Sequence, residues 1–365
     1  MGRKSFLYSH RMNLFTDTLS LQAPVLQAPM AGVQGHALAA AVCQAGGLGA
    51  IPAAMLTLEA LDAELTQLRA QTQRPYNVNF FVHTQPVADD AALRRWHAAL
   101  APHYRGLGLD ETAMPTGAGR MPFNAQAAEV LERHRPAVVS FHFGLPDPEL
   151  MARVKRMGSV VWSSATTVDE ARWLVQHGVD AVIAQGLEAG GHRGLFLTDD
   201  LTTQVGTLAL LPQIVAAVEV PVIAAGGIAD AAGVRAARAL GASAVQIGTA
   251  YLCADEALTG PLHRAALRSE AARHTALINV FTGRPARGIV NRAMRELGPI
   301  SDAAPAFPLA TAAIAPLRAA AEAQGLADYS PLWAGQHASA IREASARALT
   351  QDFVRAWHQP VAHHA

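Results

Sequence analysis

The chain has 365 residues, of which 51% are hydrophobic and 16% are charged, and its 29 basic and 29 acidic side chains give a formal net charge of zero. A chain this apolar is not broadly disordered, and without a positive charge excess it lacks the signature of a nucleic-acid-binding protein. The two cysteines, Cys43 and Cys253, are too few for a disulfide framework and have no metal-ligand spacing. These features predict a protein of a reducing compartment with no metal site.

Residues 1–22 include basic side chains but no continuous apolar segment, and no later stretch reaches the roughly 18 uninterrupted apolar residues of a membrane span. We therefore expect a soluble, cytoplasmic protein without a membrane partner.

Short β-rich apolar runs alternate along the chain with segments at helical spacing, a pattern typical of a parallel sheet built from βα units. Eight runs predict strands: 25–30, 48–53, 76–82, 137–144, 159–165, 180–186, 220–227 and 244–252. Intervening helices have clear caps, with Thr57, Thr167 and Asp230 at their starts and Gly178 and Gly241 at two of their ends. Eight βα units in about 250 residues predict an α/β fold of the (β/α)8 TIM-barrel type.

Other segments do not fit the count of eight βα units. Residues 101–123 are rich in Gly and Pro and are predicted to form a long loop after the third barrel helix. Residues 255–325 are assigned to a second, smaller, mostly helical domain that covers the active site, and 335–357 to a long amphipathic helix that closes the barrel. The barrel domain is thus expected over 1–254, completed by 326–365.

The active site of such a barrel lies at the carboxyl ends of its strands. Gly226-Gly227 and Gly248-Thr249 follow the last two strands, where barrels of this type frequently bind phosphate through backbone N–H groups. Gly226 and Gly227 alone are equally consistent with a tight turn, but the second pair one unit later favours a phosphate site.

Two histidines are also expected at this end. His192 and Arg193 lie in the glycine-rich loop after the sixth strand, and an imidazole there can bind an anion or take a proton. Arg193 is at least as well explained as a structural salt-bridge partner. On the fourth strand, alternation points His142 into the barrel mouth and the rings of Phe141 and Phe143 away from it, although a hydrogen-bonded core histidine is the alternative.

An ordered set of motifs closely resembles the nitronate monooxygenases, in particular their class I group: QAPMAG (27–32), GGLGAI (46–51), NVNFF (77–81), SFHFGLP (140–146), EAGGHRG (188–194), AAGGI (224–228), QIGTAYL (246–252) and WAGQ (333–336). The resemblance implies an FMN-binding barrel with His192 as the catalytic histidine and His142 as a second active-site histidine. It implies that the cofactor is bound by Pro29, Met30, Asn79, Gln185, Gly190, Gly191, Gly226, Gly227, Gln246, Gly248, Thr249 and Gln336.

The resemblance further implies oxidative denitrification of an alkyl nitronate with O2, giving a carbonyl compound and nitrite or nitrate. We expect small-molecule partners only, and a monomer or homodimer. Two alternatives stay open: an FMN-dependent enoyl or quinone reductase that uses NAD(P)H, and a flavin-binding protein without catalysis.

One segment departs from the family pattern. Where class I members commonly have two tyrosines and a lysine facing the substrate, this chain has Phe307, Thr311 and Ala315. We therefore expect a more apolar substrate pocket, lined by Phe307 and Thr311, with Tyr104 of the long loop as a possible source of one hydroxyl.

Overall fold

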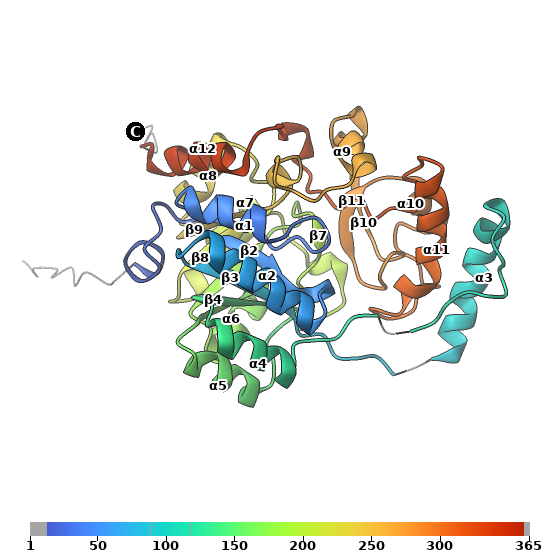
Figure 1. Ribbon diagram of the computed structural model, residues 1–365, viewed down its shortest axis with the longest axis horizontal. Coiled ribbons are helices and arrows are strands. Elements are labelled where there is room, and N and C mark those ends of the chain that lie inside the picture. The colour runs from blue at the N-terminus through green and yellow to red at the C-terminus, as the bar shows by residue number, and fades with distance from the viewer. Residues whose placement is uncertain (1–12, 88, 118, 361–365) are drawn as a thin grey trace, which may run out of the picture.

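The computed structural model describes residues 13–87, 89–117 and 119–360, so the prediction for residues 1–22 falls partly outside the described residues. Eight parallel strands form one sheet in the order β1-β9-β8-β6-β5-β4-β3-β2 (Figure 1). Their bounds are Val25–Gln27, Gly49–Pro52, Tyr76–Phe81, Val138–His142, Val160–Ala165, Ala181–Gln185, Val222–Ala225 and Ala244–Ile247 for β1 to β6, β8 and β9. All eight predicted strands are confirmed.

The two end strands, β1 and β2, meet through a parallel bridge between Leu26 and Leu48, which brings the sheet close to a closed barrel. Side chains strengthen this seam: the Gln27 amide accepts a hydrogen bond from the backbone N–H of Ala50 and donates one to Gln34. Gln34 in turn donates to the Ala50 carbonyl, so every polar group of this buried junction that could be orphaned finds a partner.

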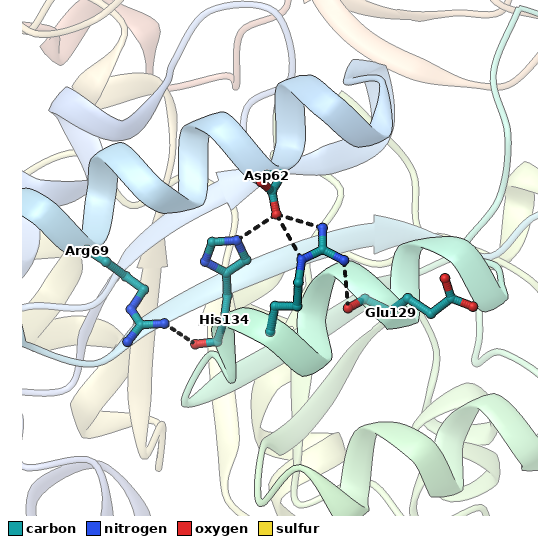
Figure 2. A network of polar contacts seen from close by, with 5 residues as sticks. Asp62, Arg69, Glu129 and His134 are labelled. Atoms are coloured by element: carbon teal, nitrogen blue, oxygen red, sulfur yellow. Dashed lines mark hydrogen bonds and ion pairs between the residues drawn. The ribbon is translucent and has the colours of Figure 1, made fainter.

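Helices cover the outside of the barrel: α1 to α2 and α4 to α8 span His36–Gln44, Leu58–Gln71, Ala125–His134, Pro148–Arg156, Val168–Gln176, Thr207–Ala217 and Ala231–Ala239. Thr57, Thr167 and Asp230 cap α2, α6 and α8 through their side-chain oxygens, as predicted. Asp62 of α2 accepts hydrogen bonds from Arg133 and His134 of α4, and Figure 2 shows the contact with His134. Since this cluster is partly exposed, the buried apolar contacts between the helices contribute more to stability.

The last helix, α12 (Ala346–His358), packs against α8 and α1. It is shorter than the predicted helix over 335–357, because the start of that segment bonds elsewhere. The backbone N–H of Gly335 donates to Thr249 and that of Gln336 to the Glu188 carbonyl, which fixes this part of the segment against the barrel loops. Ser345 then caps α12.

An outer layer with its own hydrophobic core lies beyond the carboxyl ends of the strands. Its three-stranded antiparallel sheet joins β10 (Thr275–Ile278), β11 (Ala286–Ile289) and the two-residue β7 (Gly191–His192). Its helices are α3, α9, α10 and α11, over Asp90–Gly106, Pro261–Leu267, Arg292–Leu297 and Ala310–Ala323. Residues 255–325 therefore contain two strands as well as helices.

Helix α3 corrects the prediction for 101–123, since residues 101–106 are its last turns and not loop. It stands away from the barrel and packs on α11 (Figure 1). The apolar face of α3 carries Trp96 and Tyr104, whose indole N–H and hydroxyl donate to the carbonyls of Ala310 and Ala313. The barrel helix after β3 is instead α4. Within the described part of the chain, no helix is long and apolar enough to cross a membrane.

Candidate active site

A cavity of about 730 Å³ opens at the carboxyl ends of the barrel strands, under the outer layer. Its volume and position are those of a small-molecule or cofactor site. Most of the residues predicted for the site line it: Pro29, Met30, Asn79, His142, Gln185, Gly190, Gly191, His192, Gly226, Gly227, Gln246, Gly248 and Thr249. Among the described residues, no group of three His, Cys, Asp or Glu side chains is arranged to hold a metal ion.

His192 enters the cavity from β7, whose pairing with β11 positions it opposite Ala286. Its Nε2 lies 3.0 Å from the Thr282 hydroxyl. Burial lowers the pKa of His192 well below its usual value, and the nearby Arg120, His142, Arg284 and His83 lower it further. The imidazole is therefore neutral at neutral pH. The Thr282 hydroxyl has one hydrogen and two acceptors in reach, the His192 Nε2 and the Arg284 carbonyl at 3.3 Å. The neutral ring therefore presents an N–H at Nδ1 when the hydroxyl donates to Nε2, and a lone pair at Nδ1 when it donates to Arg284.

His142 has both ring nitrogens engaged within the chain. Nε2 lies 3.1 Å from the backbone oxygen of His192 and Nδ1 lies 3.0 Å from the Ser164 hydroxyl. Since a carbonyl only accepts, Nε2 carries the proton and Nδ1 accepts from Ser164. Burial lowers the pKa of His142 to about 3. His142 is thus a neutral ring that anchors the backbone of His192.

Gln185 is a second anchor of the same loop. Its amide donates to the His192 carbonyl at 2.9 Å and accepts from the Gly194 N–H at 2.7 Å. Arg193 is fully buried, and its guanidinium donates to Gln204 and to the carbonyls of Gly186 and Gln185. Arg193 is therefore structural, but in the described structure it is held by hydrogen bonds and not by the salt bridge that was the structural alternative, and it does not line the cavity.

Asn79 lies within β3, two residues before its end, and its amide donates to the hydroxyl and carbonyl of Ser140. Asn77, two residues deeper in the barrel, donates to the same hydroxyl. The two asparagines share a face as the strand period predicts, but only Asn79 reaches the cavity.

The loops after β8 and β9 present unused backbone donors. Gly226 and Gly227 have φ angles of +116° and +70°, which turn the chain sharply after β8. Within the described residues, the backbone N–H groups of Gly226, Gly227, Gly248 and Thr249 have no acceptor. Because all four residues line the cavity, their free N–H groups together form a cradle of hydrogen-bond donors.

The segment 333–337 covers this cradle. A Cβ at Gly190 would lie 2.6 Å from the carbonyl carbon of Ala334, so the segment packs directly on the loop before His192. His337 donates through Nδ1 to the Gly227 carbonyl, at 3.2 Å. Gln336, predicted to close over the cofactor, is exposed and does not line the cavity, whereas its neighbours Gly335 and His337 do.

Aromatic rings surround His192. Phe81, Phe143, Phe307 and Trp333 have centroids 5.5–6.0 Å from the imidazole. The prediction for strand β4 is right for Phe141, which is buried away from the site, and wrong for Phe143. The strand ends at His142, and Phe143 adopts a φ of 74°, which brings its ring to 4.6 Å from that imidazole.

None of the three residues predicted for the substrate pocket, Tyr104, Phe307 and Thr311, is part of the cavity lining. The Tyr104 hydroxyl is buried in the outer core, 2.6 Å from the carbonyl of Ala313. The Thr311 hydroxyl donates to the carbonyl of Phe281. Phe307, by contrast, contacts His192 edge-on.

Sequence reasoning missed Arg120, which lines the cavity from the loop after α3. Its guanidinium carbon lies 5.7 Å from the centre of the Phe307 ring, and it is the charge that most lowers the pKa of His192. No signal in the sequence distinguishes this arginine from others in loops.

A sequence profile described as nitronate monooxygenase matches residues 12–356. The nitronate monooxygenase of Paraburkholderia phytofirmans is 41% identical over 347 residues, covering 94% of each chain. That of Pseudomonas aeruginosa is 40% identical, covering 93% of this chain and 97% of its own.

Solved structures agree with this result. A nitroalkane oxidase from Streptomyces ansochromogenes has a TM-score of 0.85 and 40% identity, with 94% of this chain and 97% of that chain covered. FabK from Thermotoga maritima is more distant, with a TM-score of 0.68 and 26% identity over 95% of this chain and 96% of its own. The enoyl reductase domain of MlnA from Bacillus amyloliquefaciens, at 15% identity and a TM-score of 0.52 over 75% of this chain and 65% of its own, shares the fold alone.

Proposed function

This chain belongs to the nitronate monooxygenase family and has nitronate monooxygenase activity, and we propose that it binds FMN in the barrel cavity and oxidises alkyl nitronates with O2 to carbonyl compounds and nitrite or nitrate. The observation that carries the cofactor proposal is the set of orphaned N–H groups at Gly226, Gly227, Gly248 and Thr249. They suit a phosphate monoester at the end of a flat cofactor.

The remaining lining residues fit the rest of FMN. Asn79, Gln185 and Gln246 offer amide groups around the cavity, and Met30 offers an apolar side chain beside Gly248. When bound, the flavin supplies the redox chemistry by which electrons pass from the nitronate to oxygen. The protein binds the substrate anion, orients it and excludes water.

In this proposal His192 is the catalytic residue. Its neutral ring presents an N–H at Nδ1 to an anionic nitronate when the Thr282 hydroxyl donates to Nε2. The surrounding rings of Phe81, Phe143 and Phe307 keep water away, which strengthens that hydrogen bond. His142 and Gln185 are positioning residues, because they act on the substrate only through the backbone of His192.

Residues 255–325 act as the cover of this site. They supply Thr282, which sets the orientation of His192, and Phe307, which contacts it. Together with α3 they would form the second, smaller domain, separate from the barrel.

The test is anaerobic spectroscopy of the purified holoprotein, with the released flavin identified by chromatography. Propionate 3-nitronate and butyl 1-nitronate are expected to bleach the flavin absorbance, and in air to yield nitrite or nitrate. NADH and NADPH are expected to leave the spectrum unchanged. Bleaching by a nicotinamide alone would assign the protein to the reductases, and a protein without flavin would refute the cofactor site.

A further inference from the structure

We propose that Arg120 is the specificity-determining cation of this enzyme, which binds an anionic group on the tail of the nitronate substrate. The inference rests on the proposed function and adds to it a residue of this chain that recognises the anionic tail of the substrate. It starts from the segment over 305–318, which lacks the lysine expected from the family pattern, with Ala315 in that place.

The cavity lining contains two arginines, Arg120 and Arg318. Arg318 forms an ion pair with Glu322 at 2.7 Å, so its charge is already compensated. Arg120 has no carboxylate within ion-pair distance in the described part of the chain. Its guanidinium contacts the Phe307 ring and, weakly at 3.9 Å, the Met55 sulfur. Arg120 is therefore the cavity cation that remains available to a ligand.

Three further arginines near the site donate to backbone carbonyls, although the buried Nε of Arg284 has no hydrogen-bond partner in the described structure. Arg193 bonds to the carbonyls of residues 185 and 186, and Arg284 bonds to the Leu195 carbonyl while stacking on Phe143. Arg287 donates to the carbonyls of Leu187 and Thr275. None of the three lines the cavity, so they do not compete with Arg120 for a substrate anion.

Phe307 contacts both the Arg120 guanidinium and the His192 imidazole. The His192 ring lies 5.5 Å from the Phe307 centroid and the Arg120 guanidinium carbon lies 5.7 Å from it. The cation and the catalytic imidazole thus flank one aromatic ring. Both His192 and Arg120 line the same cavity, so a nitronate held at His192 can extend a short chain within it and bring a terminal anion to Arg120.

The geometry of the guanidinium group favours a carboxylate as the ligand of Arg120. A guanidinium presents a planar fork of donors that pairs with a carboxylate through two parallel hydrogen bonds. Arg120 is half-buried, so its guanidinium has already lost part of its hydration. An anionic ligand supplies hydrogen bonds in place of the lost water. In this chain the cation thus comes from the loop after α3. In the family pattern it comes instead from the segment that contains α11.

The experiment measures kcat and KM for propionate 3-nitronate, which has a carboxylate tail, and for butyl 1-nitronate, whose tail is neutral. In Arg120→Met, kcat/KM for the carboxylated substrate is expected to fall about 10- to 100-fold, mainly through KM, with less than threefold change for the neutral one. Arg120→Lys is expected to keep part of the preference. Inhibition by propionate, a carboxylate without a nitronate, should weaken in parallel in Arg120→Met.

Arg105→Gln is the matched control, because it removes one positive charge from a surface ion pair with Glu111 on the same outer layer. It should leave both substrates and bound flavin unchanged. Wild-type protein that oxidises nitronates but shows the same substrate ratio as Arg120→Met would overturn the role of Arg120 and leave the proposed function intact. Wild-type protein that oxidises neither nitronate would instead refute the proposed function.

Discussion

The His142 ring donates its Nε2 hydrogen to the backbone carbonyl of His192, over 3.1 Å. The two histidines of the site therefore have different roles, because His142 holds the backbone of His192 in place. Ser164 fixes the tautomer of His142 from the opposite side of the ring. The position of the His192 imidazole depends on this contact as well as on β7.

Replacing His142 by alanine removes this anchor. We expect kcat to fall about 10- to 100-fold, because the His192 ring is displaced from its productive position. Flavin content should stay unchanged. His142→Gln, whose amide nitrogen can reach the same carbonyl, should recover much of the rate. Equal rates for His142→Ala and wild type in steady-state assays would show that the anchor has no catalytic role.

Replacing His192 itself by alanine should have a larger effect. We expect the protein to fold and to retain its flavin, while kcat/KM for nitronates falls about 10²- to 10⁴-fold, since the group that faces the substrate is lost. Thr282→Val tests the partner hydroxyl and should give a smaller loss. Full activity of His192→Ala would remove the histidine from the mechanism.

Gly227→Arg should abolish flavin binding. Gly227 has a φ of +70° and lines the cavity, so the new side chain both strains the backbone and obstructs the phosphate cradle. Gly178→Arg is the control, because Gly178 has a similar φ of +86° but faces open space at the end of α6. Fluorescence of flavin released on denaturation measures occupancy. Unchanged occupancy in Gly227→Arg would refute the phosphate site.

Tyr104→Phe should affect stability and not catalysis. The Tyr104 hydroxyl bonds to the Ala313 carbonyl inside the outer core, and its loss leaves that carbonyl without a side-chain donor. We expect the free energy of unfolding to fall by about 1 kcal/mol, as measured by urea denaturation, with kcat and KM within twofold of wild type. A changed KM for nitronates would mean that this hydroxyl reaches the substrate after all.

Stability should fall on acidification below pH 6.5. Burial lowers the pKa of His142 to about 3 and the pKa values of His83 and His263 to about 4. Because these rings regain an ordinary pKa when the chain unfolds, the unfolded state binds more protons between pH 6.5 and 4. Their contribution to stability is thus complete above pH 6.5 and is lost as the pH falls toward 4.

Denaturation midpoints at pH 7.5, 6 and 5 measure this dependence. His83→Leu should make it shallower, because its ring is buried and both ring nitrogens lack a partner in the described structure. His274→Leu, at an exposed position, should not. Identical slopes for His83→Leu and wild type would contradict the assignment.

Local sequence determined much of the barrel. Strand runs and helix caps depend on neighbours within a few residues, so all eight strands and the caps at Thr57, Thr167 and Asp230 were predictable. That the glycine pairs after the last two strands line one cavity was also predictable, because the ends of parallel strands necessarily meet at one end of a barrel.

Tertiary structure alone decided what crosses between layers. Trp96 and Tyr104 make α3 look like any amphipathic barrel helix, and only the presence of α11 directs it outward. Arg120 follows α3 to the cavity, and His142 acts through a carbonyl 50 residues away in the chain. Such contacts join segments that are distant in sequence. Periodicity and spacing describe near neighbours only, so they could not predict these contacts.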